Sequence, residues 1–332
     1  MYCNSCMMQI SKNEVVYCEQ CGVPLHKKCA NNCMICKKTL CDTCYAENNF
    51  KCEDCFKPNK SFQIIRRSYI EQYAECPYSL YLQLVKGIEP PMGKHAQLGV
   101  IVHKLIERIS KNEIDIAQAK AMLEDEIQEW NSSTDEEYSL ISLDLENVGN
   151  RCLDAFWLMR DRFAEDCKTE YQMKYSIEDD LPMISCTADR IDFDKDEIYI
   201  HDWKTGKAMS GQKLITNLQP PLYIEAVAKT FGTYPKAFTL HYLNAGKSLT
   251  YKNIAPKRYE VTTSRNSYIL DIDESLERTK KILTDIKKGK FNMPKKETHQ
   301  WRCKNMCWFG LSGKCEGSQK EQWRILNEQY AS

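Results

Sequence analysis

The sequence has neither a long apolar segment nor an excess of charge of either sign. No apolar run in its 332 residues approaches the roughly 20 residues needed to cross a bilayer. Its 46 basic residues are balanced by 46 acidic ones, so any contact with a polyanion must depend on local patches. The N-terminus also lacks the pattern of a secretory signal peptide. We therefore expect an intracellular (cytoplasmic) protein that does not insert into a membrane.

The chain also lacks the Gly-x-x-x-x-Gly-Lys-[Ser/Thr] loop that cradles nucleotide phosphates, which excludes an ATP-driven motor of that type. What the sequence has in excess is cysteine, with 18 residues. Disulfides are rare inside cells, so these cysteines need another explanation. Eleven precede residue 56 and three lie between residues 303 and 315, a distribution that indicates metal sites from both ends of the chain.

Residues 1–57 contain a regular series of potential metal ligands and few long apolar patterns, so we expect this segment to need metal to fold. Five Cys-x-x-Cys pairs and one His-x-x-Cys pair supply the twelve ligands Cys3, Cys6, Cys18, Cys21, His26, Cys29, Cys33, Cys36, Cys41, Cys44, Cys52 and Cys55. A gap of two residues lets both thiolates reach one ion at about 2.3 Å. The histidine favours zinc over an iron–sulfur cluster, and twelve ligands suffice for up to three tetrahedral zinc sites.

The first four pairs resemble a RING- or PHD-like cross-brace, in which pairs one and three share an ion, as do pairs two and four. Pairs five and six would then form a ribbon of their own, although spacing alone does not fix the pairing. A recruitment or DNA-contact module is the expected role, ahead of a ubiquitin ligase. A helicase or another replication or recombination protein is the kind of partner that such a module would recruit.

A second domain is expected over residues 62–318, followed by a tail at 319–332. Periodicity predicts helices at 68–85, 96–109, 113–130 and 144–165, then strands at 169–178 and 183–204. A helix at 212–231, strands at 236–244 and 248–252 and a helix at 268–288 complete the order. This order predicts an α/β fold with a mixed sheet flanked by helices.

Two carboxylates and a lysine are predicted to converge on this sheet. Side chains alternate along a strand, so Asp202 and Lys204 share one face while Trp203 points to the other. A turn near Lys195 would bring Asp189 roughly opposite residue 201. Carboxylate oxygens bind Mg²⁺ or Mn²⁺, the bound metal lowers the pKa of water, and a neighbouring lysine can stabilise developing charge.

These residues resemble motifs II and III of RecB-like PD-(D/E)XK nucleases, a group that includes the CRISPR-associated adaptation exonucleases. Cys186 stands where that family often has glycine, a change that affects backbone packing rather than the ligands. Gly99 to His103 is similar to the family's Gly-x-x-x-His motif, and Gln219 to Tyr223 is similar to its Gln-x-x-x-Tyr motif. Pro220 and Pro221 place the latter motif at a helix start.

The resemblance implies a restriction-endonuclease-like fold, and it implies a role for each residue that matches a motif of the family. His103, Asp189 and Asp202 would hold Mg²⁺ or Mn²⁺, and Lys204 would assist activation of the water. Gln219 and Tyr223 would support the site or the DNA. Glu170, at the start of the first predicted strand, is a candidate for a further acid.

Cys303, Cys307 and Cys315 leave a metal site one ligand short, and Cys76 can supply the fourth. One upstream cysteine and three near the C-terminus resemble the [4Fe–4S] staple of iron–sulfur members of the same family. The gaps of three and seven residues between the last three cysteines depart from the usual ones, so zinc stays an alternative. In either case the role would be structural.

The sequence as a whole predicts a metal-dependent DNA nuclease, either an exonuclease or a single-strand or flap endonuclease. Its substrate would be single-stranded DNA or duplex ends. The alternative is a zinc-dependent interaction or adaptor protein whose nuclease-like scaffold is inactive. The sequence retains the three predicted metal ligands, His103, Asp189 and Asp202, together with Lys204. An inactive scaffold would not need all four, which argues against that alternative.

Overall fold

The computed structural model describes residues 2–3, 8–11, 13–19, 21–32, 38–41, 63–133, 145–292, 303 and 307–315. Two compact units are formed. The first contains residues 1–90, 178–182 and 280–332, and the second contains residues 91–177 and 183–279. Among the helices in the described part of the chain, none combines the length and the apolar character needed to span a membrane. The predicted tail at 319–332 lies outside the described residues.

The N-terminal part of the first unit is built from two small hairpins. Strand β1 (Val15–Tyr17) pairs antiparallel with β2 (Pro24–His26), and β3 (Asn31–Asn32) pairs antiparallel with β4 (Thr39–Leu40). A short 3-10 turn, η1 (Lys27–Cys29), connects β2 to β3. Buried Ile10, Leu25 and Leu40 form a small core that also includes three cysteines.

The same unit contains β5 (Ile64–Arg66) and two helices where one helix was predicted over 68–85. Helix α3 (Arg67–Glu75) is followed by Cys76, and the extended backbone of Cys76 separates α3 from α4 (Pro77–Leu84). Pro77 explains the break, because proline disfavours helical backbone in the residue before it and is well placed at the first position of a new helix. The rings of Tyr73 and Tyr81 both contact Phe291 from the later part of the chain.

In the second unit, seven of the described strands lie in one mixed sheet. They are β6 (Cys167–Tyr175), β7 (Met183–Asp194), β8 (Glu197–Lys204), β9 (Ala237–Tyr242), β10 (Lys247–Ala255), β11 (Arg258–Thr262) and β12 (Ser267–Asp271). The order is β12-β11-β10-β9-β8-β7, with β6 also paired to β7. Within this unit β8 and β9 are parallel and the other pairs are antiparallel, which confirms the predicted mixed sheet.

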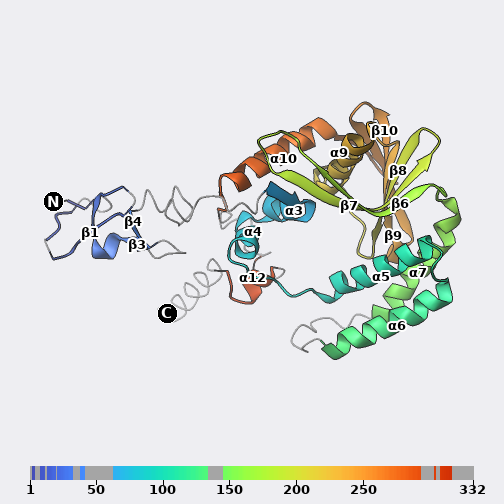
Figure 1. The fold of residues 1–332 in the computed structure, drawn as a ribbon, viewed down its shortest axis with the longest axis horizontal. Helices are drawn as coiled ribbons and strands as arrows, with labels where there is room; N and C mark the ends of the chain where they lie inside the picture. The colour runs from blue at the N-terminus through green and yellow to red at the C-terminus, as the bar shows by residue number, and fades with distance from the viewer. Residues whose placement is uncertain are drawn as a thin grey trace. The chain divides into compact units, whose positions relative to one another are not determined.

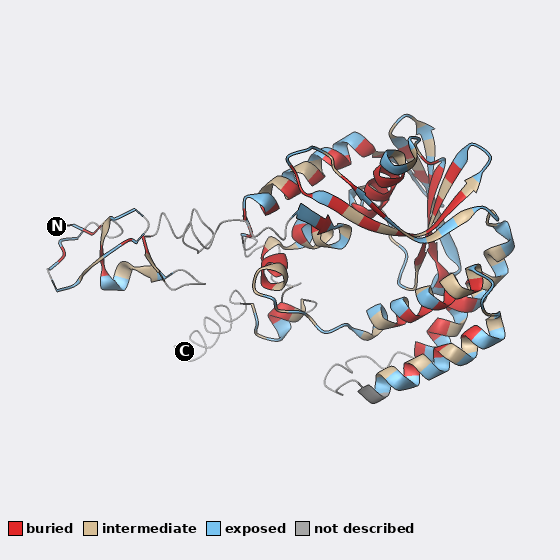
Figure 2. Ribbon diagram, in the orientation of Figure 1, coloured by how far each residue is buried: buried red, intermediate tan, exposed pale blue. Residues whose placement is uncertain are grey.

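Helices of the second unit cover both faces of the sheet (Figure 1). On one face, α5 (Lys94–Ser110), α6 (Ile116–Ser133) and α7 (Leu145–Met159) form an apolar cluster that includes Trp203 of β8. On the other face, α9 (Gln219–Phe231) packs on β6 and β7, and its Tyr223 ring lies against Phe238 of β9. All of β9 is buried, as are the first nine residues of α9 (Figure 2). The fold class predicted from the sequence is confirmed.

Several predicted boundaries were wrong. The helix at 144–165 ends at Met159, followed by the 3-10 turn η4 (Arg160–Arg162). The helix at 212–231 is two helices, α8 (Lys213–Thr216) and α9. Strands β11 and β12 were missed, and the last long helix, α10, covers Ile272–Lys287 rather than 268–288.

A polar network links four neighbouring strands. Ser248 Oγ lies 2.9 Å from His241 Nδ1, and His241 Nε2 lies 3.0 Å from His201 Nδ1. The other ring nitrogen of His201 is 3.4 Å from Asp192 Oδ2, and Arg190 Nε donates to Asp192 Oδ1 at 2.5 Å. Because each buried polar group here has a partner, the hydrogen bonds offset the cost of desolvation and favour this register of the strands.

Burial, together with the nearby His201, lowers the pKa of His241 to about 3. An unfolded chain binds a proton at a histidine with a pKa of about 6.5, so between these values the unfolded state binds more protons. Stability should therefore fall as pH decreases from about 6.5 towards 3, by at most about 1.4 kcal/mol per pH unit from this group. His241→Gln should weaken this acid dependence in urea unfolding measured across that range.

His95→Gln is the matched control, because His95 is an exposed residue of α5. It should leave the acid dependence as it is in the unmodified protein. An undiminished slope in His241→Gln would show that the imidazole is not the group responsible.

Candidate active site

The β7–β8 hairpin brings the two predicted carboxylates together. Arg190 pairs with His201, a register that places Asp189 beside Asp202 rather than opposite residue 201 as predicted. The turn contains Lys195 in a left-handed conformation at φ 56°, as the predicted turn near this residue requires. Directly opposite residues of an antiparallel pair share a face, so both carboxylates lie on the same side of the sheet.

Asp202 is almost fully buried and is held from two directions. Its Oδ1 accepts a hydrogen bond from Gln219 Nε2 at 2.6 Å, and its Oδ2 lies 2.5 Å from Lys204 Nζ. Oδ2 nevertheless accepts no hydrogen bond of good geometry. Burial, with Asp189 nearby, raises the pKa of Asp202 in spite of Lys204. A buried carboxylate oxygen that accepts no well-formed hydrogen bond is suited to contact with a cation.

Asp189 bridges the hairpin and helix α5. Its Oδ2 accepts a hydrogen bond from the backbone N–H of Trp203 at 2.6 Å, and its Oδ1 lies 3.4 Å from His103 Nδ1. Burial alone would raise the pKa of Asp189, but His103, Lys204 and the Trp203 N–H together lower it. Conversely, burial lowers the pKa of His103, and the charge and hydrogen bond of Asp189 outweigh burial and raise it. The pair is therefore electrostatically coupled.

Glu170 joins this pair through an unusual backbone conformation. In β6, Thr169 pairs with Arg190 and Tyr171 with Ala188, so Glu170 lies across from Asp189. Its φ of 46° is left-handed, which is rare for a residue with a side chain and costs on the order of 1–3 kcal/mol. Although the residue stays exposed, partial burial of its carboxyl group and the nearby Asp189 raise the pKa of Glu170 to about 7.

His103, Glu170 and Asp189 each offer a ligand atom, and the three atoms lie within 4.8 Å of one another. Asp202 is not part of that close group, but its charge acts on both His103 and Asp189. Carboxylate oxygens with one imidazole form a donor set that suits Mg²⁺ or Mn²⁺. The buried Oδ2 of Asp202, beside the Lys204 ammonium, adds a further carboxylate oxygen. The side chains therefore fit a divalent cation.

Helix α9 positions the remaining predicted residues. Gln219 is its first residue and Pro220 and Pro221 follow, so the Gln-x-x-x-Tyr motif does stand at a helix start. Tyr223, one turn later, donates a hydrogen bond to the Thr187 carbonyl of β7 at 2.7 Å. Gln219 therefore orients a carboxylate directly, whereas Tyr223 fixes the strand that carries Asp189.

The profile of the PD-(D/E)XK nuclease superfamily matches residues 67–310, which is most of the chain. This chain belongs to the PD-(D/E)XK nuclease superfamily. Among solved structures, the crystal structure of SSO0001 is similar at 12% sequence identity and a TM-score of 0.29, over 74% of this chain and 91% of that one. So distant a likeness carries no functional argument. No curated protein matches the sequence.

The superfamily typically hydrolyses phosphodiester bonds and generally uses Mg²⁺ or Mn²⁺. Asp189, Asp202, Lys204, His103, Gln219 and Tyr223 all lie in the matched range. Sequence reasoning gave Glu170 less weight than these residues. Its place beside Asp189 depends on a left-handed backbone at a residue other than glycine, and no residue pattern signals that conformation.

The four cysteines of the predicted staple belong to the first unit. Cys76 stands before α4, and Cys307 stands before the short helix α12 (Trp308–Leu311). Burial raises the pKa of the Cys76 thiol, and the thiols of Cys307, Cys303 and Cys315 raise it further. The four residues thus lie within electrostatic range of one another.

Of the twelve predicted zinc ligands, six are described, and they form two groups of three. Donor atoms of Cys3, His26 and Cys29 lie within 4.8 Å of one another, as do those of Cys18, Cys21 and Cys41. Cys3 of the first pair therefore lies beside the third pair, and Cys41 of the fifth pair lies beside the second pair. The ligands that lie outside the described residues are Cys6, Cys33, Cys36, Cys44, Cys52 and Cys55.

Proposed function

We propose that this chain is a metal-dependent DNA nuclease, acting as an exonuclease or as a single-strand or flap endonuclease. Membership of the superfamily supports phosphodiester hydrolysis. The observation that carries the proposal is the convergence of His103, Glu170 and Asp189 beside the Asp202–Lys204 pair. A purely structural cluster would not need Glu170 and Asp189 packed so closely with Asp202 nearby, because repulsion among carboxylates is unfavourable unless a cation offsets it.

His103, Asp189 and Asp202 would hold Mg²⁺ or Mn²⁺, with Glu170 as a further oxygen donor. The bound ion supplies polarisation of the phosphodiester and a water molecule of lowered pKa. Lys204 Nζ, held 2.5 Å from Asp202 Oδ2, would orient that water or stabilise the charge that develops on the phosphate. Gln219 would keep Asp202 oriented through its 2.6 Å hydrogen bond.

We also propose that Cys76, Cys303, Cys307 and Cys315 ligate a [4Fe–4S] cluster. The backbone in this region packs very tightly. A Cβ added to Gly310 would lie only 2.2 Å from the Cys303 carbonyl oxygen, so glycine is required there. The backbone N–H of Cys315 also donates to the Phe309 carbonyl at 2.8 Å. Two fixed backbone contacts therefore hold the last three cysteines in one small region.

The spacing of the thiols bears on the choice between a cluster and a single zinc ion. Thiolates bound to one tetrahedral zinc at about 2.3 Å would lie about 3.8 Å apart. Among the described residues, groups of three or more donor atoms within 4.8 Å occur in three places, and the Cys76 group is not one of them. A larger four-iron cluster fits thiols that are near one another but not this close.

Purified full-length protein should degrade labelled single-stranded DNA in the presence of Mn²⁺ and should stop when EDTA removes the metal. Because Glu170 faces the metal position, Glu170→Gln should raise the Mn²⁺ concentration needed for half-maximal cleavage by about 10-fold or more. A Mn²⁺ titration of the cleavage rate measures this shift. Glu165→Gln, which neutralises an exposed acid just before β6, is the control and should leave the titration unchanged. Cleavage that persists in EDTA would contradict the proposal.

A further inference from the structure

We propose that the N-terminal module binds two zinc ions in crossed sites, one held by Cys3, His26 and Cys29 and the other by Cys18, Cys21 and Cys41. Along the chain the ligands alternate between the sites, because Cys18 and Cys21 lie between Cys3 and His26. This pairing differs from consecutive zinc knuckles, in which each ion would take ligands from neighbouring pairs. It is independent of the proposed nuclease activity.

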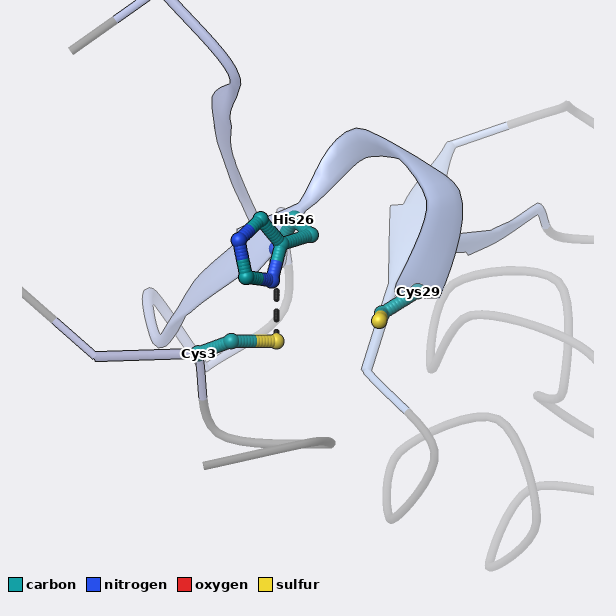
Figure 3. Close-up of side chains that lie close together, drawn as sticks. All are labelled: Cys3, His26 and Cys29. Atoms are coloured by element: carbon teal, nitrogen blue, oxygen red, sulfur yellow. Dashed lines mark hydrogen bonds between the residues drawn. The ribbon is translucent and has the colours of Figure 1, made fainter. Parts of the chain in front are cut away.

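The first site gathers residues from two separate pieces of chain, one with Cys3 and the other with His26 and Cys29. Cys3 precedes the first hairpin, His26 ends β2, and Cys29 ends η1. The two sulfur atoms and the imidazole face a common space (Figure 3), and one donor atom from each residue lies within 4.8 Å of the others. Cys3 Sγ also accepts a hydrogen bond from the backbone N–H of His26 at 3.3 Å. Such an N–H supports a thiolate, the form that binds metal.

The second site begins in a tight turn. Gly22, directly after Cys21, has a φ of 76° and donates its N–H to the Cys18 carbonyl at 2.8 Å. This left-handed position suits glycine and lets Cys18 and Cys21 face the same point. Cys21 Sγ lies 3.7 Å from Cys41 Sγ, close to the roughly 3.8 Å expected between two thiolates on one tetrahedral zinc.

Contacts that involve no metal ligand side chain independently fix this pairing. The backbone N–H of Glu19 donates to the Thr39 carbonyl at 2.8 Å, and the backbone N–H of Thr39 donates to Glu19 Oε1 at 2.8 Å. These bonds hold the segment with Cys41 beside the turn that carries Cys18 and Cys21. The hydrogen bonds between Glu19 and Thr39, and not the thiols alone, therefore place Cys41 beside Cys18 and Cys21.

Zinc is the ion that this donor chemistry selects. Thiolates with one imidazole match tetrahedral zinc, and the described core of the module contains only three buried aliphatic side chains, Ile10, Leu25 and Leu40. So small a core needs metal binding to stabilise it. The Cys-x-x-Cys spacing predicts Cys6 and Cys44 as the fourth ligands, but both lie outside the described residues. The test below therefore uses only the six described ligands.

The pairing can be measured without changing any residue by exchanging zinc for ¹¹³Cd in the full-length protein. Proton–cadmium correlation spectra should connect one cadmium signal to the β-protons of Cys3 and Cys29. A different signal should connect to those of Cys18, Cys21 and Cys41. A single cadmium signal coupled to both Cys3 and Cys18 would overturn the crossed arrangement.

Paired substitutions give a second readout in zinc content per chain. Cys3→Ser with Cys29→Ser should remove about one zinc ion, as should Cys18→Ser with Cys41→Ser, because each double variant damages one site. Cys3→Ser with Cys18→Ser should remove about two, because it damages both. The opposite order of losses would refute the proposal. Cys167→Ser, which changes a cysteine on β6, is the control and should keep the zinc content unchanged.

Discussion

Asp202→Ala and Lys204→Ala should each reduce DNA cleavage at saturating Mn²⁺ by at least about 100-fold, the scale expected when one electrostatic contact to the transition state is lost. Asp202 Oδ2 is buried and Lys204 Nζ lies against it, so each substitution removes a charge that serves the metal position. Asp202→Asn tests the same charge with an isosteric side chain. Cleavage rates on labelled single-stranded DNA measure the effect.

These variants should stay folded. Asp202→Asn keeps a side-chain oxygen that can accept the hydrogen bond from Gln219 Nε2, so its thermal unfolding temperature should stay close to that of the unmodified protein. Lys207→Ala, an exposed lysine just beyond β8, is the control for Lys204 and should cleave normally. Near wild-type cleavage by Asp202→Ala in purified protein would refute the proposed mechanism.

Cys76→Ser should abolish the brown colour and the iron content of anaerobically purified protein as completely as Cys307→Ser does. The two residues are 231 positions apart (307 − 76), so equal effects follow only if both ligate one cluster. Loss of the cluster should also lower the unfolding temperature, because the connection between the start of α4 and the C-terminal cysteines is lost. Iron analysis and thermal unfolding measure both effects.

Cys152→Ser is the control for this pair, because Cys152 is a fully buried thiol in the α5–α7 core. It should keep its iron even if its stability changes. Full colour in Cys76→Ser would show that the four-ligand assignment is wrong. Colourless anaerobic protein that contains additional zinc would show that the four cysteines bind a different metal.

Short-range patterns predicted the centre of the site well. Alternation along β8 places Asp202 and Lys204 on one face and Trp203 on the other, and the contacts confirm this: Trp203 packs with α5–α7, whereas Asp202 meets Gln219 of α9. The two prolines after Gln219 likewise predicted the start of α9. The side-chain period of β8 determines which face each residue occupies, and the restricted backbone of the two prolines determines where α9 begins.

Features that depend on distant contacts or on unusual backbone were not predicted. The place of Glu170 beside Asp189 depends on a left-handed φ, which the sequence does not signal. The pairing of Cys41 with Cys18 and Cys21 depends on the Glu19–Thr39 hydrogen bonds, which identical Cys-x-x-Cys spacings do not encode. Strands β11 and β12 have only five residues each, and the stronger helical period that follows them obscured their alternation.

The most direct test of the central claim is a crystal structure of the protein soaked in Mn²⁺, with the ion located by its anomalous scattering. We predict a manganese ion bonded to His103, Asp189 and Asp202, with the Glu170 carboxylate beside it and Lys204 Nζ facing the open coordination positions. Manganese that is absent from these residues at a saturating concentration would contradict the account. That result would leave this domain as a nuclease-like scaffold without the proposed chemistry.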